Sequence, residues 1–435
     1  MYINNIKSPQ DVKRLTTDQL CVLADEIRQA LLAKLSVHGG HVGPNLGMVE
    51  ATIAMHYVFE SPKDKIVYDV SHQSYPHKML TGRKDAYLYE EHYDDVSGYT
   101  NPGESEHDFF TVGHTSTSVS LACGLAKGRD LKGEKGNVIA VIGDGSLSGG
   151  EALEGLDYAA ELGGNLIIVV NDNDMSIAEN HGGLYRNLAE LRASNGACER
   201  NIFRAMGLDY RYLDAGNDVL ALVDALQELR DIDHPIVLHV STAKGKGFEP
   251  AQSDPEHWHH VGPFDMATGR KLCPGHPSEP APRTYADITG EALSAAIERD
   301  PQVVGITAAT PYIMGFTPEL RSAAGKQFVD VGIAEEHAVT FATALARSGA
   351  KPVFGVYGTF LQRAYDELWH DLCLNDAPAT ILVFGASIFG TTSETHLSFF
   401  DISMLGGLPN MRYLAPACME AVSYTHLTLP TNSLV

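Results

Sequence analysis

The stretch VIAVIGDGSLSGGEALEGLDYAAELGGNLIIVVNDN (residues 138–173) decides which fold we expect. Two short, continuously apolar runs, VIAVIG (138–143) and NLIIVV (165–170), are typical of buried parallel strands. The segment between them, EALEGLDYAAELG, has a helix pattern. A strand, a helix and a strand in succession form a βαβ unit, which predicts a parallel sheet covered by helices.

The same pattern continues on both sides of this stretch. Towards the N-terminus, residues 17–35 predict an amphipathic helix, HGGHVGPNLG (38–47) a glycine-rich loop, and residues 48–59 another helix. IVYDVS (66–71) is a strand candidate. Towards the C-terminus, PIVLHVST (235–242) predicts a further buried strand. All of these elements fit one α/β domain, 1–270.

A proline-rich segment separates this domain from a second α/β pattern. KLCPGHPSEPAPRT (271–284) holds four prolines in 14 positions and predicts a linker. The strand candidates after it are QVVGITA, QFVDVG, KPVFGVYG and ATILVFG, and IAEEHAVTFATALARS is a helix between two of them. We therefore expect an α/β protein with two successive open, mainly parallel-sheet domains, the second over 285–421.

The last residues, 422–435, depart from this pattern. VSYTHLTLPTN (422–432) has no core pattern and resembles the translation of a common sequencing adapter. We expect an artefact here, and a natural disordered tail is the alternative.

Composition narrows the class of protein. The formal net charge of this 435-residue chain is −23, and an acidic chain binds polyanions poorly, so nucleic acid and anionic membranes are not expected partners. No apolar stretch approaches the length of a membrane span, and the start, MYINNIKSPQDVKRL, lacks a signal-peptide pattern. Six scattered cysteines without a CxxC pair indicate reduced thiols, so we expect a cytoplasmic protein.

Polar residues follow both strands of the βαβ unit. Asp144 lies in GDG directly after the first strand, and Asn173 lies in NDN directly after the second. Such side chains emerge at the carboxyl edge of the sheet, where ligands bind. Mg²⁺ prefers oxygen ligands and shares them with phosphates, so the predicted ligands are Asp144, Asn173 and the backbone carbonyl of Met175. Gly143 and Gly145 would let the backbone approach a diphosphate closely.

The pairing of GDG with NDN is the pattern of thiamine-diphosphate enzymes, whereas GDG alone is more often a plain turn. Further motifs occur in order, namely GGHVGPNLG, DVSHQSYPHKMLTGR, VGHTSTSVS, KGKGFEP, DVGIAEEHAVTFATALA, VYGTFLQRAYDELWHD and THLSFFDIS. Together they resemble the 1-deoxy-D-xylulose-5-phosphate synthase family, within the wider transketolase-like group. The resemblance runs from about residue 10 to 420 and covers the first two of three family domains, which implies that the third, C-terminal domain is missing.

The resemblance implies a cofactor, a reaction and an oligomer. A diphosphate-binding domain is followed by a pyrimidine-binding domain, with thiamine diphosphate and Mg²⁺ between them in a homodimer. The family joins pyruvate to glyceraldehyde 3-phosphate with loss of CO₂, and the product feeds isoprenoid, thiamine and pyridoxal synthesis. Two alternatives stay open: a transketolase-like enzyme with a different acceptor, and a cofactor-binding but inactive fragment.

Three residues of the second domain have implied roles. The carboxyl group of Glu335 would face N1′ of the aminopyrimidine and promote removal of the C2 proton of the cofactor. The alternative is a carboxylate that only stabilises a helix N-terminus, which we expect for Glu336. Phe360 would stack on the pyrimidine and Tyr357 would approach the substrate, and an aromatic core pair is the alternative for these two.

Histidines of the first domain complete the implied site, because imidazoles can hold diphosphate oxygens and shuttle protons near neutral pH. The catalytic residues implied by the resemblance are Glu335, His41, His72, His259 and Tyr357. The implied cofactor-binding residues are His72, His114, Gly143, Gly145, Ser146, Lys244, Glu335 and Phe360. The histidines expected to be structural or solvent-facing are His38, His77 and His260.

One departure from the family concerns the phosphate of the acceptor. The family usually has an arginine after the strand ATILVFG, where this chain has Gly385, and Thr392 replaces a nearby aspartate. Thr395 and His396 of the family's TH pair remain. Glycine cannot supply the bidentate clamp of an arginine, so the sequence predicts weaker phosphate recognition, with His396 and Arg363 as substitutes.

Overall fold

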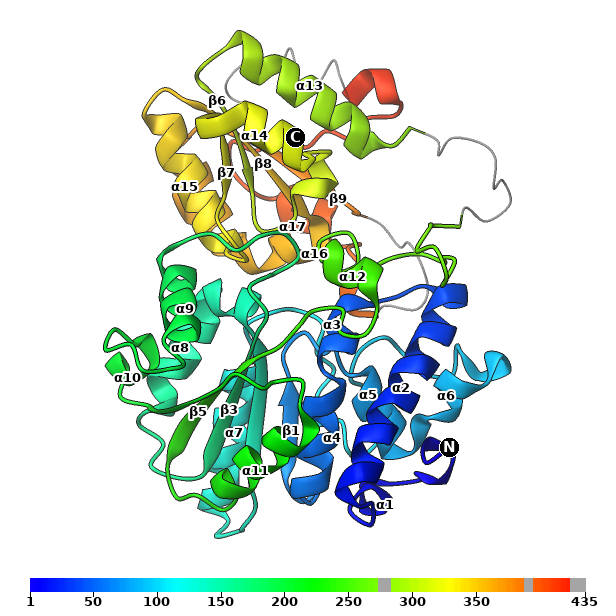
Figure 1. Ribbon diagram of the computed structural model, residues 1–435. Coiled ribbons are helices and arrows are strands. Elements are labelled where there is room, and N and C mark those ends of the chain that lie inside the picture. The colour runs from blue at the N-terminus through cyan, green and yellow to red at the C-terminus, as the bar shows by residue number, and fades with distance from the viewer. Residues whose placement is uncertain (273–282, 387–393, 423–435) are drawn as a thin grey trace. The chain divides into compact units, whose positions relative to one another are not determined.

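The computed structural model describes residues 1–272, 283–386 and 394–422 (Figure 1). The chain divides into two compact units: unit 1 comprises Met1–Glu179 and Gly183–Ser278, and unit 2 comprises Asn180–Gly182 and the chain from Glu279 onward. The expected linker, 271–284, lies largely outside the described residues, so it stays a prediction. Val422, the first residue of the expected artefact, is buried in unit 2, and 423–435 lie outside the described residues.

Unit 1 is built on a five-stranded parallel sheet with the strand order β1–β2–β3–β5–β4. The strands are β1 (Lys65–Tyr68), β2 (Val138–Gly143), β3 (Leu166–Asp172), β4 (Asp209–Leu213) and β5 (Pro235–Ser241). Gly143 pairs with Asn171, so β2 and β3 end at the same edge of the sheet. The turns that follow these two strands therefore meet at that edge.

Helices cover both faces of this sheet (Figure 1). They are α1 (Pro9–Val12), α2 (Thr17–His38), α3 (Gly43–Gly47), α4 (Val49–Val58), α5 (Tyr75–Lys78), α6 (Asp85–Leu88), α7 (Ser118–Leu131), α8 (Gly150–Ala159), α9 (Gly183–Ala193), α10 (Ile202–Ala205), α11 (Val219–Leu229) and α12 (Glu249–Ser253). Along β2, Ile139 and Val141 pack with α2, α4 and α11, and Ala140 and Ile142 pack with α7, α8 and α9. Burial on both faces explains why β2 is continuously apolar.

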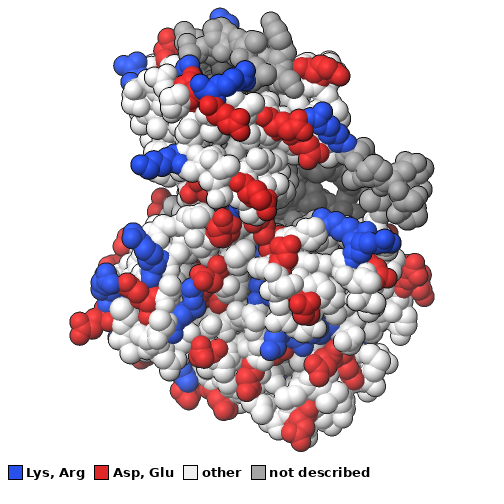
Figure 2. Space-filling view, turned by 45° about the horizontal axis from the view of Figure 1, so that its top comes forward, with Lys and Arg blue, Asp and Glu red and all other residues white. Residues whose placement is uncertain are grey.

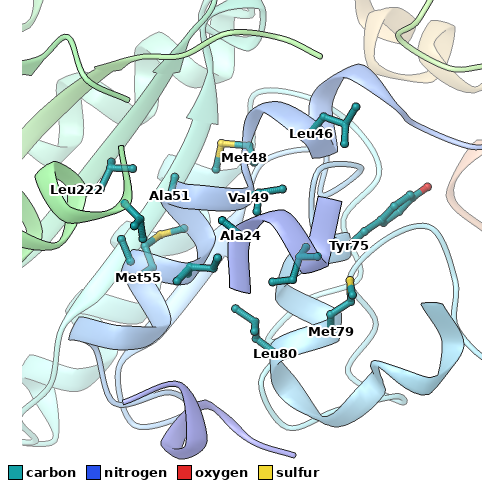
Figure 3. Packing of buried hydrophobic residues seen from close by; sticks show 14 of the residues in the cluster. Ala24, Leu46, Met48, Val49, Ala51, Met55, Tyr75, Met79, Leu80 and Leu222 are labelled. Atoms are coloured by element: carbon teal, nitrogen blue, oxygen red, sulfur yellow. The ribbon is translucent and has the colours of Figure 1, made fainter. Parts of the chain in front are cut away.

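The apolar cluster that contains Ile139 and Val141 also includes a residue of α5. Figure 3 shows Ala24 of α2, Met55 of α4 and Leu222 of α11 in this cluster. Tyr75 of α5 belongs to the same cluster, and its hydroxyl points away from the other labelled side chains. The core therefore holds α5 in place next to the loop of His72.

Three sequence-based expectations for unit 1 were wrong in detail. The strand predicted over 66–71 ends at Tyr68, because Val70 and Ser71 have φ angles of 56° and 67°, outside the strand region. The predicted loop 38–47 contains α3, which begins with Gly43 and a helix-starting proline. The first long helix continues to His38 and ends only at Gly39, where φ is 79°.

Unit 2 contains a four-stranded parallel sheet with the order β7–β6–β8–β9. The strands are β6 (Val303–Thr307), β7 (Phe328–Asp330), β8 (Lys351–Tyr357) and β9 (Thr380–Phe384). The helices are α13 (Tyr285–Arg299), α14 (Pro318–Ala324), α15 (Glu335–Arg347), α16 (Gly358–Leu361) and α17 (Asp401–Leu405), with a short 3₁₀ turn at Gln362–Ala364 and a π-helical segment at Glu367–Cys373. Separate apolar clusters cover the two faces of the sheet. The predicted class, an α/β protein with two successive open, mainly parallel sheets, is confirmed.

Two properties bear on possible ligands. In the part of the chain that the structure describes, no helix has the length and apolar character needed to cross a bilayer. Acidic and basic side chains are interspersed over the face shown in Figure 2. Since the net charge is −23, the cations that an anionic cofactor needs have to come from individual residues or from a metal ion.

Candidate active site

Two turns meet at the carboxyl edge of the unit 1 sheet. The 3₁₀ turn Asp144–Ser148 follows β2, and the turn after β3 holds Asn173. A Cβ atom on Gly145 would lie 2.5 Å from Cβ of Ser176, so only glycine lets the two turns approach this closely. Asp144 is buried in this arrangement. The structure thus brings together the two segments in which the sequence predicted metal ligands.

The side chain of Asn173 has an unsatisfied oxygen. Its Oδ1 atom is buried, yet it accepts no hydrogen bond from any residue that the structure describes. Leaving such a group without a partner costs about 1–3 kcal/mol, and a bound cation would remove this cost. A carboxylate, an amide oxygen and a backbone carbonyl form an all-oxygen donor set, so these residues fit Mg²⁺.

Metal sites can also be built from several His, Cys, Asp or Glu side chains. Within the described ranges, no group of three or more His, Cys, Asp or Glu side chains could hold a metal ion. A site made from Asp144, Asn173 and the carbonyl of Met175 contains only one of these four residue types. The finding therefore concerns sites rich in histidine, cysteine or carboxylate, and it does not bear on the predicted donor set.

Lys244 places a buried cation beside the same edge. Its Nζ donates a hydrogen bond of 2.6 Å to the backbone carbonyl of Ser176, and the side chain is only 7% exposed. Burial lowers the pKa of Lys244 to about 8, and the negative charge of Asp144 opposes this shift. A positive charge that protein atoms surround is well suited to an anionic group of a ligand.

The segment that carries His114 is fixed next to the turn Asp144–Ser148. Asp69, which follows β1, accepts hydrogen bonds from the backbone N–H groups of Ser116 (2.9 Å) and Ser118 (3.0 Å). The hydroxyl of Ser116 donates to the carbonyl of Ser146 at 2.8 Å. Sequence reasoning missed Asp69, although its position after a buried strand is the signal that identified Asp144.

Three of the four predicted histidines come together, and a fourth joins them. The ring centroids of His41 and His72 are 4.9 Å apart, and His259 lies 5.6 Å from His41 and 5.1 Å from His72. His260 is solvent-exposed, as expected, but its ring lies 4.7 Å from that of His41, so the expectation missed its place in the cluster. Burial keeps the pKa of His259 well below that of an ordinary histidine, so this imidazole is neutral at pH 7.

One asparagine holds two of the histidine-bearing loops together. The Nδ2 of Asn45 donates to the backbone carbonyls of both His41 and His72, at 2.8 Å each. Its Oδ1 accepts from the backbone N–H of Tyr75 at 2.9 Å, and the whole side chain is buried. Asn45 was not predicted, because nothing in GPNLG reveals partners so far away in the sequence.

The remaining two histidines lie as the sequence indicated. The Nε2 of His38 is 2.8 Å from a carboxylate oxygen of Asp94 at the surface. His77 is fully buried, with His56 and Asp108 each 2.9 Å from its ring nitrogens. Both have structural partners, so neither needs a ligand.

In unit 2, Glu335 is the first residue of α15 and is 2% exposed. Its Oε2 accepts no hydrogen bond within the described part of the chain, and the guanidinium Nη1 of Arg363 lies 3.7 Å away. Burial raises the pKa of Glu335 to about 7, and the charge of Arg363 opposes this shift. Its neighbour Glu336 is only half-buried. A buried carboxyl group with such a pKa can both give and accept a proton near neutral pH.

Aromatic residues gather after β8. The rings of Tyr357 and Phe360 are arranged edge to face at 5.6 Å, and Phe360 meets His396 in the same way at 5.5 Å. The hydroxyl of Tyr357 donates to that of Tyr312 at 3.3 Å. Both Tyr357 and Phe360 are half-buried, so they are not a fully enclosed core pair.

The region of the missing arginine is described in part. Gly385 directly follows β9 with a φ of 63°, and Thr392 lies outside the described residues. The hydroxyl of Thr395 is 2.9 Å from Nδ1 of His396. Arg363, the other suggested substitute, forms its ion pair with Glu335. Its charge is therefore already engaged by a carboxyl group of the candidate site.

Comparison with known proteins relates this chain to 1-deoxy-D-xylulose-5-phosphate synthases and to transketolases. A family model described as 1-deoxy-D-xylulose-5-phosphate synthase matches residues 3–200, and the model of the transketolase pyrimidine binding domain matches residues 281–428. The curated 1-deoxy-D-xylulose-5-phosphate synthase 2 of Geobacter sulfurreducens is 41% identical over 95% of this chain and 71% of its own length. The synthase of Desulfitobacterium hafniense is also 41% identical, over 94% of this chain and 70% of its own. A solved transketolase from Campylobacter jejuni covers 97% of this chain and 78% of its own, with 17% identity and a TM-score of 0.47.

Proposed function

This chain belongs to the 1-deoxy-D-xylulose-5-phosphate synthase family, and on that premise we propose that it condenses pyruvate with glyceraldehyde 3-phosphate to give 1-deoxy-D-xylulose 5-phosphate and CO₂. The observation that carries the proposal is the carboxyl group of Glu335, which is buried, has a pKa of about 7 and has an oxygen that accepts no hydrogen bond from the described residues. A carboxyl group in this state suits proton exchange with a ring nitrogen of a cofactor.

The cofactor of the family is thiamine diphosphate, which supplies an electron sink for breaking and forming carbon–carbon bonds. We propose that Asp144, Asn173 and the carbonyl of Met175 hold Mg²⁺ against its diphosphate. The buried oxygen of Asn173 supports this assignment, because it has no donor among the residues described. Open space next to Gly143, where a Cβ atom would meet nothing within 4 Å, would let an oxygen of the diphosphate approach the backbone.

Residues around this metal position would hold the diphosphate itself. Lys244 contributes a buried ammonium group, and Ser146 belongs to the glycine-rich turn that follows β2. His114 lies in the segment that Asp69 and Ser146 fix beside that turn. An acidic chain needs such local donors to bind an anion.

Each unit contributes some of the proposed proton-transfer groups. In unit 2, Glu335 would pass its proton to N1′ of the aminopyrimidine and take it back, with Phe360 packed on the ring and Tyr357 near the substrate. In unit 1, His259 is neutral near pH 7, and its buried Nδ1 has no hydrogen-bond partner in the described ranges. His41 and His72, whose loops Asn45 joins, would donate to oxygen atoms of the substrate.

A second candidate function differs only in the acceptor. Gly385 occupies the position where the family usually has a phosphate-binding arginine, which favours a transketolase-like enzyme that takes another aldehyde. Both candidates share the cofactor and the donor chemistry. We further propose that the enzyme is a cytoplasmic homodimer, as its family membership suggests, and size-exclusion chromatography with light scattering would test this.

The direct test supplies the chain with thiamine diphosphate, Mg²⁺, [2-¹³C]pyruvate and glyceraldehyde 3-phosphate. We expect ¹³C NMR to detect labelled 1-deoxy-D-xylulose 5-phosphate, and the Glu335→Gln variant to give a much lower rate. A product formed only with other aldehydes would favour the second candidate. Tight cofactor binding without any CO₂ release would instead identify an inactive cofactor-binding chain.

A further inference from the structure

The predicted metal ligand Asn173 stands between two aspartates, and a single arginine contacts both. Arg192 of α9 directs Nη1 to the two carboxylate oxygens of Asp172, at 2.7 Å each. Its Nη2 lies 2.6 Å from Oδ1 of Asp174. These contacts fix the residue before Asn173 and the residue after it to the same helix.

One end of this arrangement is rigidly anchored in the sheet. The side chain of Asp172, at the end of β3, is fully buried and lies 2.8 Å from Nε2 of His239 on β5. The other ring nitrogen of His239 is 2.8 Å from the hydroxyl of Tyr210 on β4. This carboxylate, bonded to His239 of β5, which in turn is held by Tyr210 of β4, gives Arg192 a fixed reference point.

The second aspartate, Asp174, is less firmly held than Asp172. Asp174 has a φ of 62°, a left-handed conformation that is disfavoured for residues other than glycine, although aspartate tolerates it better than most. Its backbone N–H donates to Asp172 at 3.1 Å, but its side chain is largely exposed. The contact with Arg192 is therefore what ties this exposed side chain to the anchored carboxylate.

We infer that Arg192 is a positioning residue that sets the orientation of the Asn173 side chain towards the metal ion by holding Asp172 and Asp174 on either side of it. This inference rests on the proposed function, because it requires Asn173 to be a Mg²⁺ ligand. Groups that orient a metal ligand without contacting the metal ion typically contribute a factor of about 10–100 to metal affinity.

A simpler role for Arg192 predicts the opposite change in Mg²⁺ affinity when the arginine is removed. If the arginine only compensates the buried charge of Asp172, then its removal takes a positive charge away from the metal position. Two carboxylates would remain uncompensated, and attraction between opposite charges would strengthen Mg²⁺ binding. A positioning role predicts weaker binding.

The experiment measures the apparent Kd of Mg²⁺ at saturating thiamine diphosphate, by calorimetry on the whole chain. We use Arg192→Met, together with Arg192→Lys, which keeps the positive charge but cannot contact both aspartates with a planar fork. The matched control is Arg200→Met, because Arg200 pairs with Glu190 of the same helix at 2.6 Å and touches none of residues 172–174. The melting temperature of the metal-free protein is recorded for each variant.

We expect Arg192→Met to weaken Mg²⁺ binding by about 10-fold or more, and Arg192→Lys to weaken it as well, with the control unchanged. Unchanged or tighter Mg²⁺ binding in either Arg192 variant would overturn the inference, as would a lower melting temperature with an unaltered Kd. Arg192→Lys decides the matter if Arg192→Met does not fold. Asn173→Ala tests the metal site separately from the positioning role. If Asn173→Ala also binds Mg²⁺ normally, the proposed metal site itself is wrong. If Asn173→Ala is the only variant that loses Mg²⁺ binding, only the positioning role of Arg192 is wrong.

Discussion

At single residues, two of the buried oxygen atoms that lack a hydrogen-bond donor among the described residues belong to the proposed site. They are Oδ1 of Asn173 in unit 1 and Oε2 of Glu335 in unit 2. Buried polar atoms are rarely left unsatisfied, because each costs about 1–3 kcal/mol. The proposed ligands would complete both atoms, and each one leads to a measurable expectation.

The first prediction concerns proton transfer by Glu335. Glu335→Gln keeps the size of the side chain and removes its exchangeable carboxyl proton, so cofactor binding should change little. Exchange of the C2 proton of bound thiamine diphosphate should slow by about 10²–10⁴-fold, the usual contribution of a positioned acid or base. Hydrogen–deuterium exchange followed by NMR measures this rate. Glu336→Gln is the matched control, and a wild-type rate in Glu335→Gln would rule out Glu335 as the partner of N1′.

The second prediction concerns pH and stability. Because the folded state raises the pKa of Glu335 to about 7, it binds this proton more tightly than the unfolded chain does. The resulting stabilisation is complete below the ordinary carboxyl pKa and is lost as the pH rises through about 7. The charged groups that act on Glu335 are Arg363, which lowers its pKa, and Glu336, which raises it.

Glutamine stays neutral at every pH, so Glu335→Gln should remove this loss of stability. At pH 8 unit 2 of the variant should be more stable than that of the wild type by on the order of 3 kcal/mol, and at pH 4 the two should be similar. Hydrogen exchange of the α15 amides at increasing denaturant concentration reports the difference. Equal stability at pH 8 would show that Glu335 is already ionised at lower pH.

At the scale of single elements, the strands of both sheets were predicted from the sequence, at least in part, with the exception of β4. The strand predicted over 138–143 is β2, with the same bounds. The strand Asp209–Leu213 was missed because it lies at the edge of the sheet, and its half-exposed residues form no continuous apolar run.

The candidate site could also be predicted only in part from the sequence. Motif positions identified His41, His72 and His259, and the structure brings these three together. The contacts of Asn45 and Arg192 could not be predicted, since hydrogen-bond partners far apart in sequence leave no periodic pattern. Sequence reasoning therefore finds residues inside recognisable motifs, and the residues that hold those motifs in place require coordinates.

The third prediction belongs to the loop element that Asn45 supports. Asn45→Ala removes three hydrogen bonds and leaves the half-buried carbonyl groups of His41 and His72 without this donor. Unit 1 should lose about 2–4 kcal/mol of stability. Urea unfolding followed by the fluorescence of Trp258, in a Trp369→Phe background, reports on unit 1 alone. Asn4→Ala at the surface is the control, and a loss no larger than that of the control would contradict the role of Asn45.

Across the whole chain, the proposed function assigns donor chemistry and acceptor choice to different residues. The groups proposed for the donor reaction are present in both units at the expected motif positions. Recognition of the acceptor phosphate lacks one usual arginine, because Gly385 stands in its place. Losing a charge-assisted contact typically costs about 1.5–3 kcal/mol, or roughly one to two powers of ten in affinity.

The fourth prediction follows from this difference. The ratio of kcat/KM for glyceraldehyde 3-phosphate to that for glyceraldehyde should lie below about 10⁴, the range that a single remaining contact can supply. Gly385→Arg should raise the ratio by roughly 10-fold, and Gly385→Ala, which meets the same strain at a φ of 63°, should not. A wild-type ratio above 10⁴ would show that another cation replaces the arginine.

We expect GDG and NDN to form a magnesium-dependent site for thiamine diphosphate, and calorimetric titration with the cofactor would show whether they do. The wild-type chain should bind thiamine diphosphate only when Mg²⁺ is present, and Asp144→Ala should abolish this metal-dependent binding, because it removes the only carboxylate of the proposed donor set. Wild-type affinity in Asp144→Ala, or binding that is the same with and without Mg²⁺, would contradict the account.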